Sequence, residues 1–254
     1  MNFAASIVPV APLRKEAAHR SEMVSQLLFG ECVTILEEAK DFVLVKCLYD
    51  NYEGWCQRSQ LTEIDETFYN SNHKYLTAEP MSIAEINGKP MMLPPGCFIG
   101  CFENGILQMG SYTVTFSQQP FDFEDGSDEV DIYEIMHPYL NRSYLWGGKS
   151  IFGIDCSGFT QQVFKMLDIK LPRDAYQQAE IGEGIGFLQE ARCGDLAFFD
   201  NAEGKIIHVG IMLNASEIIH ASGRVRIDPI DDQGIYNHEL GRYTHQLRII
   251  KSFL

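Results

Sequence analysis

A single cysteine lies between a glycine-rich turn and an apolar pattern of helical spacing, and this feature constrains the fold most. Residues 144–159 read Tyr-Leu-Trp-Gly-Gly-Lys-Ser-Ile-Phe-Gly-Ile-Asp-Cys-Ser-Gly-Phe, with the cysteine at position 156. The glycines interrupt regular structure, whereas the apolar residues that follow Cys156 recur every three or four positions. These residues are Phe159, Val163, Phe164 and Leu167. The stretch therefore predicts a turn that leads into a helix beginning near Cys156.

This position suits Cys156 for nucleophilic attack. A free thiol has a pKa of roughly 8.5, and the partial positive charge at a helix N-terminus favours the thiolate. The backbone N–H groups of a first helical turn have no partners within the helix, so they can stabilise an oxyanion. An inert buried thiol is the alternative, because free cysteines are usually buried.

A nucleophilic thiol needs a base, and two histidines follow on predicted strands. Residues 205–213 read as a buried strand that carries His208, and residues 216–221 as a second strand that carries His220. The short turn at 214–215 makes the two strands antiparallel neighbours, which brings the histidines side by side. We therefore expect Cys156, His208 and His220 to be nucleophile, base and orienting group.

Five ordered sequence blocks resemble one known family. They are Tyr-Leu-Trp-Gly-Gly at 144–148, Asp-Cys-Ser-Gly-Phe at 155–159, Leu-Pro-Arg-Asp-Ala-Tyr-Gln-Gln at 171–178, His-Val-Gly-Ile at 208–211 and Ile-His-Ala-Ser at 219–222. Over residues 130–252 the chain resembles the NlpC/p60 family of bacterial cell-wall cysteine peptidases. The resemblance implies a papain-like α+β core, in which the cysteine helix packs on an antiparallel sheet that carries the histidines.

The resemblance also implies a substrate groove around Cys156. Tyr144 would support the oxyanion and Trp146 would line the pocket, with simple packing as the alternative for both aromatics. Asp155 and Ser157 flank the nucleophile and would lie in the groove, although an aspartate before a helix is also a natural N-terminal cap.

In family members with two N-terminal SH3-like modules, the aspartate of the Leu-Pro-Arg-Asp block helps to hold the free amine of an N-terminal L-alanine. Asp174 is that residue here, with capping of the following helix as the alternative. A glutamate and a tyrosine of the first module close the same end of the groove, and Glu22 and Tyr52 match best. Glu31, Glu53 and Tyr49 compete with them. Where those relatives often have serine, this chain has Ala175, so a hydroxyl contact is absent there.

The first half of the chain predicts two small β modules. Short β-rich runs at 32–36, 42–47 and 52–56 alternate with glycine and acidic turns, and they resemble a bacterial SH3-like module. A second series at 81–86, 90–99 and 111–116 predicts a diverged second module. An acidic joint at 121–129 then precedes a helical stripe at 130–140. We expect an SH3-like domain at 1–74, a second at 75–122, and the catalytic domain at 123–254.

The net charge narrows the classes of binding partner, and the cysteines indicate the redox compartment. The net charge of −15 and the pI near 4.8 disfavour nucleic acid and anionic membranes as partners, because both are bound by clustered Lys and Arg. The N-terminus lacks the basic start of a secretory signal, and no run approaches the roughly 20 apolar residues of a membrane span. Seven cysteines form no disulfide framework, which suits a reducing compartment. We expect a cytoplasmic location.

No metal or cofactor is expected. Cys97 and Cys101 lie within one apolar run without a second pair, which does not suit zinc. The five histidines outside the predicted pair are interpreted as surface or structural residues. They are His19, His73, His137, His238 and His245.

The sequence therefore predicts a cysteine endopeptidase. What the resemblance implies is hydrolysis of the γ-D-glutamyl–L-diamino acid bond of cell-wall stem peptides with a free N-terminal L-alanine, as in murein recycling. The partner would be L-Ala-γ-D-Glu-diamino acid, while the oligomeric state is not predicted. Two alternatives stay open: an inactive wall-peptide-binding module, and an acyltransferase or other amidase on the same core. The retained cysteine and histidines favour the peptidase, and the cysteine precedes the histidines, unlike the order in circularly permuted acyltransferases.

Overall fold

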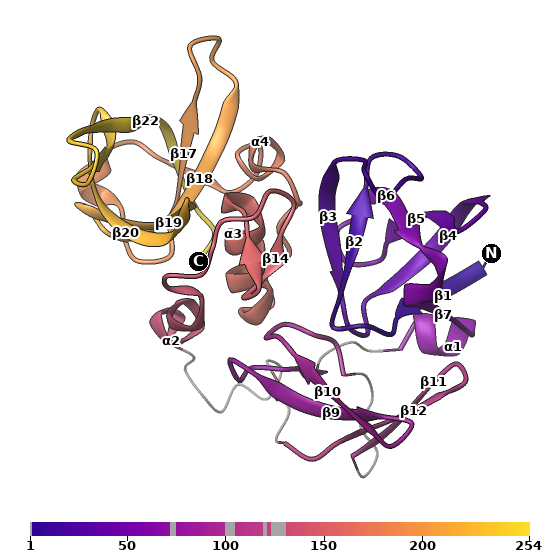
Figure 1. Ribbon diagram of the computed structural model, residues 1–254. Helices are drawn as coiled ribbons and strands as arrows, with labels where there is room; N and C mark the ends of the chain where they lie inside the picture. The colour runs from indigo at the N-terminus through magenta and orange to yellow at the C-terminus, as the bar shows by residue number, and fades with distance from the viewer. Residues whose placement is uncertain (1, 72–74, 100–104, 119–120, 123–130) are drawn as a thin grey trace.

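The structure is a computed structural model that describes residues 2–71, 75–99, 105–118, 121–122 and 131–254. Two β units formed by the first half of the chain lie beside a mixed unit formed by the second half (Figure 1). The acidic joint from 123 onward, Val130, His73 and Cys101 lie outside the described residues. No helix in the described part of the chain is long and apolar enough to cross a membrane.

The first β unit is a seven-stranded antiparallel sheet that curves into a small barrel (Figure 1). Its strands, which lie in the order β3-β2-β6-β5-β4-β1-β7, are β1 (Asn2–Ser6), β2 (Val10–Arg14), β3 (Met23–Leu28), β4 (Cys32–Ala39), β5 (Phe42–Cys47), β6 (Glu53–Gln57) and β7 (Leu61–Ile64). Alternate residues such as Val43 and Val45 enter the core, as expected for a sheet with one buried face. The 3₁₀ turn Arg58–Gln60 and the short helix α1 (Glu66–Tyr69) complete the unit.

The second β unit is a four-stranded antiparallel sheet in the order β10-β9-β12-β11. Its strands are β9 (Ser82–Ile86), β10 (Lys89–Leu93), β11 (Ile106–Met109) and β12 (Tyr112–Phe116), and β8 (Tyr75–Leu76) pairs with β13 (Phe121–Asp122) beside them. Ala84, Leu93 and Val114 of this unit share one apolar core with Leu28 and Phe29 of the first. The two β units therefore bury their apolar faces together.

The second half of the chain builds a ring of six antiparallel strands. The ring strands are β17 (Leu196–Asp200), β18 (Ile206–Asn214), β19 (Glu217–Ser222), β20 (Arg224–Asp231), β21 (Gly234–Asn237) and β22 (Arg242–Ser252). They are preceded in the chain by the helices α2 (Ile132–Met136), α3 (Cys156–Met166) and α4 (Ala175–Gln178) and by the 3₁₀ turns His137–Tyr139 and Leu188–Glu190. The short strands β14 (Lys149–Ser150), β15 (Gly153–Ile154) and β16 (Glu183–Ile185) also precede the ring strands. The ring closes because β22 pairs with both β17 and β21.

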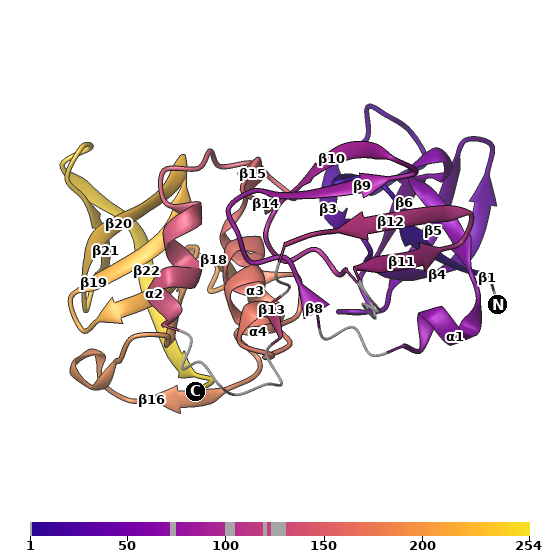
Figure 2. The ribbon, with the colours of Figure 1, turned by 90° about the horizontal axis from the view of Figure 1, so that it is seen from below.

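Helix α3 packs against the outer face of this ring. Val209 and Ile211 of β18 join the core that contains Phe159 and Val163 of α3. Met212 lies on the opposite face of β18 from Val209 and Ile211, which is the face that Gly210 shares. Met212 joins a second core that draws on all six strands and lies inside the ring. Figure 2 shows α2 and α3 between the ring and the two β units. The helix on an antiparallel sheet confirms the α+β architecture expected from the sequence.

Buried charges join the first β unit to the second half of the chain. The Glu31 carboxylate lies 2.8 Å from the Lys165 Nζ and 3.5 Å from the Lys149 Nζ, and all three side chains are buried. Lys165 also donates to the Gly96 carbonyl of the second unit at 2.7 Å. The side-chain amide of Gln161 donates to Asp50 at 2.9 Å. These contacts fix the three units relative to one another around α3.

Candidate active site

Asp155 and a glycine turn position Cys156 at the start of α3. The Asp155 carboxylate accepts hydrogen bonds from the Gly158 N–H at 2.7 Å and from the Gly147 N–H at 2.8 Å. It is therefore the N-terminal cap of the helix, which was the alternative given for this residue. A side chain at Gly158 would meet the Gly148 carbonyl, because an ideal Cβ would lie only 2.3 Å from that oxygen. The glycines thus allow the turn to lie directly on the helix start.

Arg173, which no sequence pattern marked as a site residue, contacts each part of this corner. Its guanidinium is fully buried and contacts Asp155 at 2.6 and 3.0 Å, forming a bidentate pair. It also donates to the Ser157 hydroxyl at 2.9 Å and to the Ser25 hydroxyl of the first β unit at 3.1 Å. The only sequence signal was a basic residue directly before Asp174. The cap, the residue after the nucleophile and the first β unit therefore share one anchor.

The Cys156 thiol is buried against β18. The backbone N–H groups of Val209 and Ser157 face the sulfur, which places it beside the residue that follows His208. Burial, followed by the negative charge of Asp155, raises the pKa of the Cys156 thiol to about 12. The backbone N–H groups favour the thiolate, which is the direction expected of the helix start, but loss of solvation outweighs them. Cys156 is a thiol until a base removes its proton.

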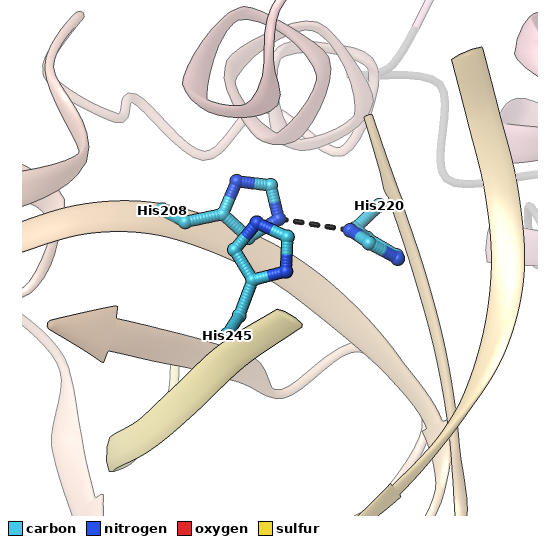
Figure 3. A group of neighbouring side chains, drawn as sticks. All are labelled: His208, His220 and His245. Atoms are coloured by element: carbon cyan, nitrogen blue, oxygen red, sulfur yellow. Dashed lines mark hydrogen bonds between the residues drawn. The ribbon is translucent and has the colours of Figure 1, made fainter. Parts of the chain in front are cut away.

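His208 and His220 lie side by side on β18 and β19, as predicted. His208 Nε2 and His220 Nδ1 are 2.8 Å apart, and both side chains are buried (Figure 3). The register pairs Gly210 with His220, and a Cβ at Gly210 would lie 2.8 Å from the His220 Cβ. The absence of a side chain at 210 therefore makes room for the His220 ring.

Asp228 of β20 extends this pair to a third group. His220 Nε2 lies 3.1 Å from the Asp228 carboxylate, which also accepts from the Arg226 guanidinium at 2.9 Å. Burial favours the neutral acid, but the contacts with His220 and Arg226 hold the pKa of Asp228 below its ordinary value. A carboxylate here accepts the Nε2 proton of His220. His220 Nδ1 is then an acceptor, and the Nε2–H of His208 donates a hydrogen bond to it.

This chain of hydrogen bonds fixes the tautomer of His208. With its Nε2 proton donated to His220, the neutral ring keeps a free lone pair on Nδ1. In Figure 3 this Nδ1 points away from both His220 and His245. Burial, then His245 and His220, hold the pKa of His208 well below its ordinary value, and burial also lowers the pKa of His220. Both rings are therefore neutral at neutral pH, which leaves His208 able to accept a proton.

His245, which was interpreted from the sequence as a surface or structural residue, belongs to the same cluster. Its half-buried ring stacks on His208 with 4.0 Å between ring centres (Figure 3). Burial lowers the pKa of His245 to about 4. His245 lies on β22, which is distant from β18 in sequence and is separated from it in the sheet by β17, so no short-range sequence pattern pointed to it.

One pocket of about 730 Å³ collects the other predicted site residues. Its lining includes Cys156, Tyr144, Trp146, Asp155, Ser157, Asp174, Glu22 and Tyr52. His208 and His220 are not among the described lining residues, although Ile206 and Ile207 of β18 are. The pocket thus lies between the helix start and the first β unit, with the histidine pair beside it.

Contacts between the first β unit and the second half define the far end of this pocket. The Trp146 indole N–H donates to Glu22 at 2.9 Å. Burial raises the pKa of Asp174, and both Arg173 and the Tyr52 hydroxyl directed at the carboxylate oppose that rise. Glu53 also lines the pocket, whereas Glu31 is buried and Tyr49 half-buried at the junction of the units. Ala175 lines the pocket without a hydroxyl.

Tyr144 lies beside the sulfur. Burial raises the pKa of the Tyr144 hydroxyl, and the next contributions come from Cys156 and Asp155. The hydroxyl is therefore protonated at neutral pH and can donate a hydrogen bond into the pocket.

Comparisons with known proteins agree with this geometry. Residues 141–243 match the model of the NlpC/P60 family, and residues 13–61 match that of the bacterial dipeptidyl-peptidase SH3 domain. A gamma-D-glutamyl-L-lysine dipeptidyl-peptidase of Bacillus subtilis is 31% identical over 78% of this chain and 71% of its own length. The chain belongs to the NlpC/P60 family. As a family member it is a hydrolase of the peptidase class, and its first β unit is an SH3-like domain.

A second relative is similar over most of its length, and two solved structures share the fold. A gamma-D-glutamyl-L-lysine dipeptidyl-peptidase of Bacillus cereus is 26% identical over 87% of this chain and 74% of its own length. A crystal structure of an NlpC/P60 protein from Bacillus cereus superposes with a TM-score of 0.80 at 22% identity and covers 99% of both chains. An NlpC/P60 endopeptidase from Photobacterium damselae has a TM-score of 0.74 at 16% identity, over 97% of this chain and 70% of its own. The structures confirm the fold expected for the chain.

Proposed function

We propose that the chain is a cysteine endopeptidase that cleaves the γ-D-glutamyl–L-diamino acid bond of cell-wall peptides with a free N-terminal L-alanine. The observation that carries this proposal is a single pocket in which Cys156 of the catalytic half meets Glu22 and Tyr52 of the SH3-like domain. The names of the two Bacillus relatives support the bond and the dipeptide product.

The proposed reaction begins with transfer of the Cys156 proton to Nδ1 of His208 as the sulfur attacks the γ-carbonyl carbon. Because the thiol is protonated at rest, attack and proton transfer belong to one step. The imidazolium that forms donates from Nε2 to His220, whose own Nε2 proton is held by Asp228. The Tyr144 hydroxyl and backbone N–H groups at the start of α3 stabilise the oxyanion.

Collapse of the tetrahedral intermediate breaks the amide bond. The diamino acid amine leaves with the proton from His208 Nδ1, and a thioester joins Cys156 to the dipeptide. A water molecule then gives its proton to His208 and attacks the thioester carbonyl, which releases L-Ala-γ-D-Glu and restores the thiol.

The other end of the pocket binds the free amine of L-alanine. Asp174 and Glu22 supply carboxylates, and the Tyr52 hydroxyl is directed at Asp174. An ammonium group placed there gains charge-assisted hydrogen bonds, whereas an acylated nitrogen adds bulk and loses the charge. The pocket therefore favours released stem peptides over peptides still attached to glycan through L-alanine.

We also propose that the enzyme acts on wall fragments in the cytoplasm. The cysteines support a reducing compartment, because no two of the six in the described part of the chain form a disulfide with each other and five of them are buried. Cell fractionation with an antibody against the chain tests this proposal. Recovery with the extracellular or wall fraction would contradict it.

Peptide hydrolysis tests the proposed activity directly. The protein is incubated with L-Ala-γ-D-Glu-meso-diaminopimelate or with its L-lysine counterpart, and L-Ala-γ-D-Glu is followed by mass spectrometry. Cys156→Ala should abolish product formation, whereas Cys193→Ala, a half-buried thiol outside the pocket lining, should keep the wild-type rate. Tight binding of intact peptide without product would instead support a peptide-binding module.

Blocking the amine tests how the pocket recognises its substrate. N-acetylation of the L-alanine should lower kcat/KM by at least about tenfold, since charge-assisted hydrogen bonds are lost. Equal rates for blocked and free peptides would show that Glu22, Tyr52 and Asp174 do not recognise the terminus.

A further inference from the structure

Three imidazoles converge in the ring, although the proposed proton relay uses only two. His208, His220 and His245 come from β18, β19 and β22, and one ring nitrogen of each lies within 4.8 Å of those of the other two (Figure 3). The His220 ring stands edge-on to both others, with ring centres 5.1 Å from His208 and 5.6 Å from His245. The arrangement presents three nitrogens to one small volume.

Two of these rings already have an oxygen partner on the nitrogen that faces away from the cluster. His220 Nε2 contacts the Asp228 carboxylate at 3.1 Å, and His245 Nδ1 lies 2.9 Å from the Thr244 hydroxyl. Histidines that ligate metals generally use the opposite ring N–H in this way, which fixes the tautomer and aims the lone pair. His220 Nδ1 and His245 Nε2 are the nitrogens left for a shared ligand.

We infer that this cluster is a regulatory binding site for a divalent cation of the zinc class, with His208 Nε2, His220 Nδ1 and His245 Nε2 as ligands. Imidazole nitrogens suit Zn²⁺, and three of them with one water are a common four-coordinate set. Zinc–nitrogen bonds of 2.0–2.1 Å require nitrogens roughly 3.4 Å apart, so the rings need only small rotations. His245 is half-buried, so its side of the cluster gives the cation access.

A bound cation would stop the proposed reaction by changing the tautomer of His208. The cation accepts one lone pair from each nitrogen, and no group is oxidised or reduced. The proton on His208 Nε2 moves to Nδ1, so the hydrogen bond to His220 is replaced by two metal bonds. A protonated Nδ1 cannot accept the Cys156 proton. Binding rests on the geometry alone, whereas the inhibition rests on the proposed function.

Direct binding tests the site without using activity. Cys156→Ala protein removes the nucleophilic thiol as a ligand, and Co²⁺ serves as a spectroscopic probe that Zn²⁺ displaces. His245→Phe keeps an aromatic ring on His208 but has no ligand atom, and His245→Gln is a second replacement. His238→Phe, an exposed histidine that packs on Tyr236, is the matched control.

The expected result is a visible Co²⁺ spectrum corresponding to one site per chain. The affinity for Co²⁺ should fall by at least about tenfold in both His245 variants, because even the loss of a residue that only hydrogen-bonds a metal ligand costs about tenfold in metal affinity. It should remain unchanged in His238→Phe. Equal affinity in the His245 and His238 variants would overturn the inference, as would the absence of a spectrum at millimolar Co²⁺.

Inhibition is then measured on protein with Cys156 intact. Zn²⁺ should inhibit peptide hydrolysis reversibly, with recovery on addition of a chelator, and each variant is compared with its own metal-free rate. His245→Phe should require at least about tenfold more Zn²⁺ than His238→Phe. Equal sensitivity would place the inhibitory metal elsewhere and overturn the inference. A protein without hydrolysis in the absence of metal would contradict the proposed function, while the Co²⁺ result would still decide whether the site binds metal.

Discussion

The hydrogen bonds among Asp228, His220 and His208 decide which nitrogen of His208 keeps its lone pair. The Asp228 carboxylate accepts a hydrogen bond from the Nε2–H of His220. His220 Nδ1 therefore accepts a hydrogen bond from the Nε2–H of His208. Because each step fixes the next, a carboxylate that does not contact the thiol sets the lone pair of the proposed base. Asp228 is thus a positioning residue in the proposed mechanism.

Replacing the Asp228 carboxylate with an amide should reverse the hydrogen bonds that run from residue 228 through His220 to His208. Asp228→Asn can donate to His220 Nε2, which favours the wrong tautomers of both rings. We expect kcat to fall by at least about tenfold with little change in KM. Glu239→Gln is the control, because it removes an exposed carboxylate 2.9 Å from the same Arg226 guanidinium. Equal kinetics for the two variants would contradict a positioning role.

The depressed pKa of His208 predicts the acid limit of activity. A base is active above its pKa, and the pKa of His208 lies well below the ordinary value of 6.5 because of burial and the neighbouring histidines. We therefore expect kcat/KM to stay level as the pH falls through 6.5 and to decline only at lower pH. The measurement is kcat/KM between pH 4.5 and 8. An apparent pKa at or above 6.5 would disagree with the buried neutral ring.

At the scale of elements, the β18–β19 hairpin and the start of α3 carry the proposed catalytic groups. Val209 directs its backbone N–H at the Cys156 sulfur and its side chain into the core with α3. Gly210 then allows His220 to approach on the opposite face of the same strand. Helix packing and histidine pairing therefore depend on consecutive residues of one strand.

A methyl group at position 210 should separate the two strands. In Gly210→Ala the new Cβ would lie 2.8 Å from both His220 and Ile218 side-chain atoms. We expect unfolding free energy to fall by about 1–3 kcal/mol and kcat to fall with it, since overpacking shifts the backbone. Gly184→Ala, with no atom within 4 Å of the new Cβ, is the control for thermal unfolding and kinetics. A wild-type kcat in Gly210→Ala would show that the pair tolerates the shift.

At the scale of the whole molecule, a buried charge cluster joins the SH3-like domain to the peptidase half. Glu31 lies between Lys149 and Lys165, and it also accepts from the Leu28 N–H at 3.0 Å. Burial alone would raise the pKa of Glu31, but the two lysines hold it below its ordinary value. The carboxylate is therefore charged, and its loss would leave two buried ammonium groups without a counter-ion.

Neutralising Glu31 should destabilise the fold strongly. We expect Glu31→Gln to lower unfolding free energy by about 3–5 kcal/mol, because removing one partner of a buried ion pair leaves uncompensated charge. Glu38→Gln breaks an exposed contact with Arg58 at 2.6 Å and should cost less than about 1 kcal/mol. Guanidinium unfolding measures both. Similar losses for the two variants would indicate that the buried cluster relaxes without its carboxylate.

The sequence predicted those parts of the site that depend on short-range patterns. Cys156 follows a glycine turn, and His208 and His220 face each other because a two-residue turn sets the register of one hairpin. His245 was not predicted, since β22 follows β18 at a long distance in sequence and comes near it only when both strands pair with β17. The raised pKa of the Cys156 thiol was not predicted for a related reason, because the position in the helix is a local feature, whereas burial comes from packing.

The N-terminal half shows the same division. The runs at 42–47 and 52–56 alternate clearly and form β5 and β6, but β1 at Asn2–Ser6 was not predicted. This strand gains its place by pairing with β4 and β7, which are distant in sequence. Arg173 and Asp228 likewise acquire their contacts only from neighbouring elements. The predicted limits at 74 and 122 remain predictions, since the two β units share an apolar core.

The junction of the units has a consequence for protein engineering. Glu22 and Tyr52 reach the pocket from a domain that Arg173 and Ser25 tie to the helix start. Replacing that domain with one from a relative would transfer the proposed selectivity for a free N-terminal amine only under two conditions. The donor domain must supply a hydroxyl in place of Ser25 to contact Arg173, and a carboxylate in place of Glu31 to lie between the two buried lysines. A graft without those two groups would produce a misaligned chimera rather than a peptidase of altered preference.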